Sequence, residues 1–203
     1  MKQFWHTNII EKSFQTLLKL NREFNFILIG GWAVYFWTKK MKSKDIDIVV
    51  SFSELGKIRE KYDLIKNARL RKYEIKFNDF DIDIYVPRYS KIGFPLEKLE
   101  NDYIQNIEGF KVPTAEVILL MKLFVFEQRK NSLKGEKDKI DIISLLESLE
   151  INWKQFKNLT MMYVPSAIDI LQKVLKTTKA APELELGQHK LSKLKRQTLE
   201  ELT

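Results

Sequence analysis

The chain has 203 residues, of which 44% are hydrophobic and 31% charged, a balance that suits a folded globular protein and excludes a disordered one. Its net charge of +8 favours polyanionic partners such as nucleic acid or nucleotide phosphates, although general solubility explains the same charge equally well. Cysteine is absent and the two histidines lie far from any acidic cluster, which argues against thiolate or histidine-based metal sites.

Membrane insertion and secretion are not expected. The longest apolar stretch, from Val117 to Phe126, is interrupted by Lys122 and is too short to span a bilayer. The opening segment "MKQFWHTNII" lacks the apolar core and cleavage site of a signal peptide. We therefore expect a cytoplasmic protein with no membrane partner.

The first part of the chain alternates between helical and strand patterns. Apolar spacing predicts helices over 8–22 and 53–62, with Ser53 as a possible cap of the second. A further short helix is expected directly after Gly30 and Gly31. Short apolar or alternating runs predict strands over 24–29, 45–52, 70–77 and 79–87.

From Pro113 onward every segment has a helical pattern. Pro113, Thr114 and Glu116 form a helix-start signature. Helices are expected over 114–130, 137–150, 153–160 and 165–178, followed by a linker over 179–187 and an amphipathic helix over 188–202. We therefore predict an α+β protein, with a small mixed sheet flanked by helices in residues 1–112 and a helical module in residues 113–203.

Two stretches of alternating aspartate and isoleucine are the main chemical signal. Residues two apart in a strand share a face, so Asp45 and Asp47 point the same way, as do Asp81 and Asp83. Carboxylates this close repel each other and need a cation, for which Mg²⁺ (or Mn²⁺) completed by substrate phosphates is suited. A solvated acidic face on an edge strand is the alternative.

The glycine pair adds a second component. A strand that ends in Gly30 and Gly31 and continues into a helix brings backbone N–H groups and a helix N-terminus to one point, where phosphate can bind. Between this turn and Asp45 the chain is rich in lysine, including Lys44. These lysines could guide RNA or a triphosphate, or form a solvated loop.

In this order and spacing, "LIGGWAVYFW", "KSKDIDIVV" and "DIDIYV" resemble the nucleotidyltransferase fold shared with DNA polymerase β. The "GGWAV" stretch is similar to the opening of lincosamide and aminoglycoside nucleotidyltransferases. The later "VPTAEVILLMKLFVFEQRKNSLKGEKDKIDIISLL" resembles the abortive-infection nucleotidyltransferase toxins. The likeness covers roughly residues 24–147.

This resemblance implies a role for each matching residue. Asp45, Asp47 and Asp83 would be the catalytic and metal-binding carboxylates, with Asp81 as the substitute for Asp83. The implied nucleotide-binding residues are Gly30, Gly31, Lys44, Lys122, Asp138 and Asp141. One departure from the family pattern is Trp32, which stands where many relatives have a small hydroxyl residue.

Lys122 admits more than one interpretation, because it is a lone charge within an apolar helical run. It could reach a phosphate, pair with Asp141, or extend to solvent. Trp32, Tyr35, Phe36 and Trp37 are expected to pack in the core rather than to stack on bases.

The predicted function is metal-dependent transfer of a nucleoside monophosphate from an NTP to an acceptor hydroxyl, with release of pyrophosphate. An RNA 3′ end is the favoured acceptor, and a small molecule or a protein is the alternative. Two rivals from other classes are an inactive nucleotide- or RNA-binding module and a regulatory component with an antitoxin-like protein partner.

Overall fold

The computed structural model describes residues 2–99 and 101–202, and the chain divides into two compact units. Unit 1 comprises Met1–Phe36, Lys42–Lys91 and Pro95–Pro113. Unit 2 comprises Trp37–Met41, Ile92–Phe94 and Thr114–Thr203. The expected α+β class is confirmed.

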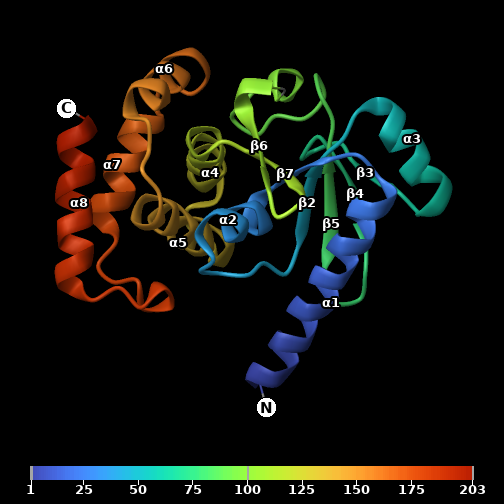
Figure 1. Cartoon of the computed structure of the whole chain (residues 1–203), viewed down its shortest axis with the longest axis horizontal. Coiled ribbons are helices and arrows are strands. Elements are labelled where there is room, and N and C mark those ends of the chain that lie inside the picture. Colours follow the sequence, from blue (N-terminus) through green and yellow to red (C-terminus); the bar gives the residue numbers. More distant parts are fainter. Residues whose placement is uncertain (1, 100, 203) are drawn as a thin grey trace. The chain divides into compact units, whose positions relative to one another are not determined.

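Unit 1 is built on a five-stranded mixed sheet in the order β1-β2-β5-β4-β3 (Figure 1). Strands β2 and β5 are parallel, and all other neighbours are antiparallel. The strands are β1 (Ile27–Ile29), β2 (Ile46–Val49), β3 (Ile65–Asn67), β4 (Lys72–Lys76) and β5 (Asp81–Tyr85). A second, two-stranded sheet pairs β6 (Ile104–Ile107) with β7 (Phe110–Pro113), and β7 contacts β1.

The two faces of the five-stranded sheet differ sharply in chemistry. Ile46, Ile48, Ile82 and Ile84 are all completely buried on one face. Each such side chain contributes roughly 1.5–3 kcal/mol to stability through burial. A register slip of one residue would exchange these isoleucines for the aspartates between them, so the hydrophobic pattern holds the acidic residues on the other face.

Helices α1 (Lys2–Glu23), α2 (Gly30–Thr38) and α3 (Phe52–Lys61) complete most of unit 1. The indole of Trp32 in α2 is fully buried and donates a hydrogen bond to Ser13 Oγ in α1 at 3.1 Å, so its expected core position is confirmed. Helix α3 is capped by Ser51, whose Oγ accepts from the Glu54 backbone N–H, and the expectation of Ser53 as the cap was wrong by two residues.

Unit 2 is entirely helical apart from short connections, as expected from its sequence. Helix α4 is apolar along most of its length and contacts α5, α6 and α7 (Figure 1). Thr114 stands at its N-cap position, although its side chain makes no capping hydrogen bond. The helices are α4 (Ala115–Arg129), α5 (Leu133–Ser148), α6 (Trp153–Tyr163), α7 (Ala167–Thr177) and α8 (Gln188–Leu202).

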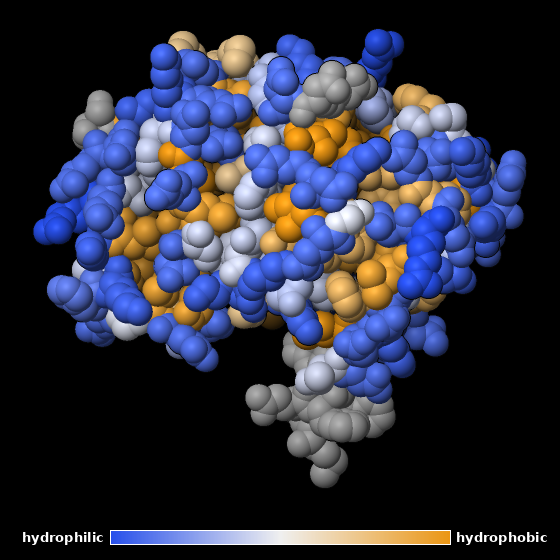
Figure 2. Space-filling view, in the orientation of Figure 1, coloured by the Kyte–Doolittle hydropathy of each residue, from blue (hydrophilic) through white to orange (hydrophobic). Residues whose placement is uncertain are grey.

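The segment expected as a linker contains a short 3₁₀ helix, Pro182–Leu184, and a bridge between Ala181 and Leu186. The face shown in Figure 2 is largely hydrophilic, with apolar residues visible between the charged ones. Within residues 2–99 and 101–202, no helix has the length and apolar character needed to cross a membrane.

Candidate active site

The parallel pairing of β2 and β5 sets the aspartates side by side. Asp47 is the direct register partner of Asp83. Asp45 lies just before β2, and its Oδ1 accepts a hydrogen bond from the Asp81 backbone N–H at 3.3 Å. The four carboxylates therefore form two rows on one sheet face, and Asp83, not Asp81, is the residue beside Asp47.

The first glycine of the pair is in direct contact with Asp47. Gly30 has a φ of +67°, which disfavours any residue with a side chain. A Cβ built there would lie 2.1 Å from Asp47 Oδ2, far inside van der Waals contact. Because Ile29 is the register partner of Asp47, the turn into α2 is held against this carboxylate. Gly30 thus allows the start of α2 and the Asp47 carboxylate to approach each other closely.

Both central carboxylates have additional partners within the sheet. Tyr85 Oη donates to Asp47 Oδ1 at 3.3 Å. Lys72 Nζ lies 2.5 Å from Asp83 Oδ2 and 2.9 Å from Glu74 Oε1, and all three of these side chains are largely buried. The other oxygen of Asp83, Oδ1, is buried without a hydrogen-bond partner.

The charges of this cluster shift its protonation equilibria. Burial and the negative charge of Asp47 raise the pKa of Asp83 to about 6, although Lys72 opposes this shift. Burial alone would raise the pKa of Glu74, but hydrogen bonds from Lys72, Asn67 and Lys76 outweigh it and lower that pKa to about 2. Burial disfavours the Lys72 ammonium, yet the Asp83 and Glu74 carboxylates raise its pKa above the usual value. Of Asp83 and Glu74, Asp83 is therefore the carboxylate whose charge is less fully compensated by its surroundings.

A divalent cation fits the chemistry of the Asp47–Asp83 pair. Both residues offer carboxylate oxygens, and Asp83 Oδ1 has no hydrogen-bond partner among the described residues. The repulsion between the two carboxylates would be relieved by the positive charge of a bound cation. Within the described residues, no group of three acidic, histidine or cysteine side chains is already arranged to hold a metal ion, so the three-carboxylate site of Asp45, Asp47 and Asp83 stays a prediction. Asp45 lies one row away, next to Asp81.

Two other charged residues near this face have peripheral positions. Lys44 is exposed directly before Asp45 and has no ion pair among the described residues. Asp81 Oδ2 accepts from Lys76 Nζ at 2.8 Å, and the Asp81 side chain is 34% exposed.

The remaining predicted nucleotide-binding residues form an ion network within unit 2. Lys122 Nζ lies 2.6 Å from Asp141 Oδ2 and 3.2 Å from Asp138 Oδ1. Arg129 binds Asp138 through two hydrogen bonds, of 2.6 and 2.9 Å. Burial disfavours the ionised form of Asp138, but Lys122 and Arg129 outweigh it and lower its pKa. Lys122 thus pairs with Asp141, which was one of the interpretations of its sequence position. Its side chain is buried, so the interpretation that it extends to solvent was wrong.

Sequence reasoning missed the three charged residues of β4. Lys72, Glu74 and Lys76 alternate along this strand and face the aspartates of β5. The alternation was a usable signal, because charged residues two apart on a strand share one face of the sheet, where they can pair with an acidic row on a neighbouring strand.

Comparisons with known proteins identify similar folds among solved structures but no relative by sequence. No protein-family model matches the chain, and no curated protein is similar to it in sequence. The solution structure of the antibiotic-resistance factor ANT(2'')-Ia matches with a TM-score of 0.54 and 13% identity, over 84% of this chain and 96% of that one. A nucleotidyltransferase-like protein from Paracoccidioides brasiliensis matches with a TM-score of 0.41 and 16% identity, over 88% and 97% of the two chains. The first likeness shows a nucleotidyltransferase fold.

Proposed function

We propose that this chain, which has the nucleotidyltransferase fold, transfers a nucleoside monophosphate from an NTP to an acceptor hydroxyl and releases pyrophosphate. The observation that carries the proposal is the pairing of Asp47 with Asp83 on parallel strands, with Gly30 in contact with Asp47. Carboxylates that can hold a metal ion, beside a strand–glycine–helix turn that can bind phosphate, suit phosphoryl transfer from a metal-bound triphosphate.

Asp47 and Asp83 would hold Mg²⁺ or Mn²⁺, with Asp45 as a further acidic group in the neighbouring row. When bound, the ion would neutralise the triphosphate and make the acceptor hydroxyl more acidic. The backbone of Gly30 and Gly31 at the start of α2 would face the phosphates, and the exposed Lys44 would add positive charge.

Asp83 is the proposed acceptor of the hydroxyl proton. In the metal-free protein, burial and Asp47 raise its pKa to about 6, so this carboxylate is ionised at neutral pH and is able to accept a proton. As the proton leaves, the acceptor oxygen bonds to the α-phosphorus. The bond from that phosphorus to the oxygen bridging to the β-phosphate then breaks, and pyrophosphate departs with the electron pair. Positioning and charge neutralisation account for this catalysis without a covalent enzyme intermediate.

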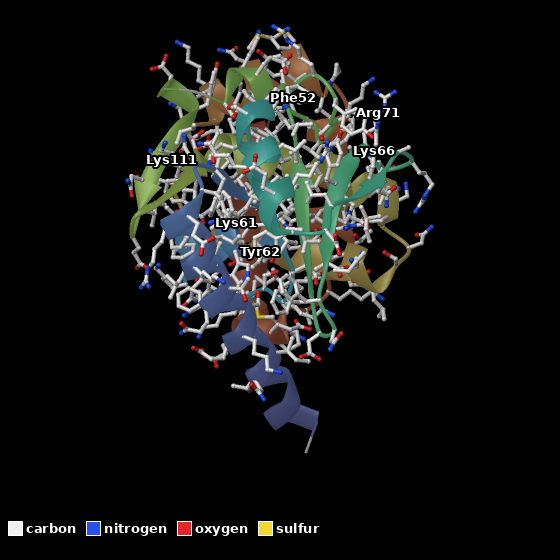
Figure 3. All side chains as sticks on the ribbon, turned by 90° about the vertical axis from the view of Figure 1, so that its right-hand side faces the viewer. Phe52, Lys61, Tyr62, Lys66, Arg71 and Lys111 are labelled. Carbon is white, nitrogen blue, oxygen red and sulfur yellow. The ribbon has the colours of Figure 1, made fainter. Side chains whose placement is uncertain are left out.

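RNA is the acceptor that we propose first, because unit 1 carries a basic face. We define the α3–β3 face by five exposed side chains of α3, β3 and the turn after it: Arg59, Lys61, Lys66, Arg69 and Arg71. Lys61 pairs with Glu23, whereas the three arginines have no acidic partner among the described residues. Figure 3 shows Lys61, Lys66 and Arg71 on one side of unit 1 together with Phe52, which is 59% exposed. Exposed cations with an aromatic side chain suit phosphates and an unstacked base.

A small-molecule hydroxyl is the second candidate acceptor, and the likeness in fold to an antibiotic-resistance factor favours it. An antitoxin-like protein partner also stays a proposal, resting on the resemblance of the helical segment to abortive-infection toxins. We propose a cytoplasmic site of action, where NTPs, Mg²⁺ and RNA are all available.

Pyrophosphate release tests the proposed activity. The purified chain should release pyrophosphate from an NTP in the presence of Mg²⁺ and single-stranded RNA. Asp47→Asn should reduce the rate by at least about 100-fold, since it removes one of the two paired carboxylates. Asp63→Asn is a matched control, because Asp63 is an exposed aspartate of unit 1 outside the acidic rows. Nucleotide binding without pyrophosphate release would instead support an inactive binding module.

A further inference from the structure

A buried lysine sits between carboxylates of the central strands. Lys72 is 8% exposed, and its Nζ contacts Asp83 on β5 and Glu74 on its own strand at 2.5 and 2.9 Å. Since Asp83 is the register partner of both Glu74 and Asp47, three acids lie side by side across three strands. The ammonium of Lys72 contacts Asp83, the middle one of these three acids.

The other lysine of this strand has a different environment. Lys76 contacts Glu74 at 3.1 Å and Asp81 at 2.8 Å, and its side chain is 45% exposed. Among the side chains that the structure describes, Lys76 forms no ion pair with Asp83. Solvent screens the charge of Lys76, whereas the charge of Lys72 acts on Asp83 at close range between two largely buried side chains.

We propose that Lys72 is a positioning residue that serves as the counter-ion of Asp83 in the metal-free protein and competes with a divalent cation for it. This inference rests on the proposed function, in which Asp47 and Asp83 hold the ion. Lys72 holds Asp83 Oδ2 on the β4 side, and its charge repels a free cation. A nucleotide-bound cation arrives with the negative charge of the triphosphate and meets less repulsion. The site therefore favours the Mg²⁺–NTP complex over free Mg²⁺.

Titration calorimetry with Mg²⁺ alone, on the full chain, tests this competition. Lys72→Met should bind Mg²⁺ about tenfold more tightly than the wild type, because it removes a cation at close range. Lys72→Arg keeps the charge and should bind as the wild type does. Lys76→Met is the matched control and should change the affinity less than twofold. Unchanged or weaker Mg²⁺ binding by Lys72→Met, together with normal Mg²⁺–NTP binding by the wild type, would overturn the inference and leave the proposed function standing.

A second pair of variants keeps the test decisive if Lys72→Met does not fold. In Glu74→Gln, Lys72 keeps Asp83 as its one carboxylate partner in the described part of the chain. It should then compete more strongly with the cation, so that the affinity for free Mg²⁺ falls severalfold. Asp81→Asn also removes one negative charge from this face of the sheet, but Asp81 pairs with Lys76 and not with Lys72. This variant should therefore lower the affinity for free Mg²⁺ less than Glu74→Gln does. Equal losses in the two variants would overturn the inference. Failure of the wild type to bind Mg²⁺ even with NTP would overturn the proposed function as well.

Discussion

Replacing Asp83 by asparagine should stabilise the folded protein at neutral pH. The pKa of Asp83 lies at about 6 in the folded protein, compared with an ordinary value of 3.8. Each pKa unit corresponds to about 1.4 kcal/mol, so the ionised carboxylate lowers the free energy of unfolding by about 3 kcal/mol. Asparagine has nearly the same shape and cannot ionise, which removes this cost.

The sign of the effect defines its pH window. Below about pH 4 Asp83 is protonated in the folded and the unfolded state, and the two proteins should be equally stable. As pH rises from 4 to 6, the unfolded state ionises more readily and the wild type loses stability. Above pH 6 the full difference should persist. Urea unfolding between pH 3 and 8, in EDTA to exclude metal, measures it.

Glu74→Gln is the matched control with the opposite sign. The folded pKa of Glu74 is about 2, compared with an ordinary value of 4.5. Its ionised form should therefore contribute up to about 3 kcal/mol of stability above pH 4.5, and this contribution is lost as pH falls towards 2. Glu74→Gln should thus be less stable than the wild type at pH 7. If Asp83→Asn is also destabilised at pH 7, or if neither difference changes with pH, the electrostatic account of this cluster is refuted.

Three further predictions concern Gly30, Lys122 and Asp81. Gly30→Ala should destabilise the protein by roughly 1–3 kcal/mol and abolish pyrophosphate release, whereas Gly56→Ala, with no atom near its new methyl group, should be neutral or stabilising in urea unfolding. Lys122→Met should cost about 3–5 kcal/mol in the same assay, because it leaves two buried aspartates short of a cation, and an unchanged stability with weakened NTP binding would instead assign Lys122 to the phosphates. Asp81→Asn should reduce pyrophosphate release less than Asp83→Asn does, and the reverse order would contradict the site.

Local patterns in the sequence predicted the elements that carry the acidic residues. Alternation of aspartate with isoleucine indicated β2 and β5 and the face that their carboxylates share. The strand patterns alone could not show that Asp47 pairs with Asp83 rather than Asp81, because this pairing depends on the register of two parallel strands more than thirty residues apart; only the family resemblance favoured Asp83.

The missed strands are those whose stability comes from a neighbour. Strand β3 has three residues and β6 has four, and none of these residues is buried. Neither has the alternation of a half-buried strand, and β3 exists as the partner of the predicted β4. Strand β7, the partner of β6, was missed as well, because its four residues directly precede the helix-start signature of α4.

Lys72 shows why part of the site could not be predicted. A lysine on an alternating strand is normally exposed, and the burial of this one depends on Asp83 across the sheet. The contact between Gly30 and Asp47 could not be predicted either. The sequence indicated a turn that could bind phosphate, whereas the structure shows that a side chain at position 30 would collide with Asp47.

The most direct test of the proposed reaction is to follow the phosphate that is transferred. The chain would be incubated with Mg²⁺, single-stranded RNA and an NTP labelled at either the α- or the γ-phosphate. Nucleotidyl transfer predicts that the α-label appears at the RNA 3′ end and that the γ-label leaves with pyrophosphate. Transfer of the γ-label to RNA, or hydrolysis with no labelled RNA or other acceptor, would contradict the proposed function.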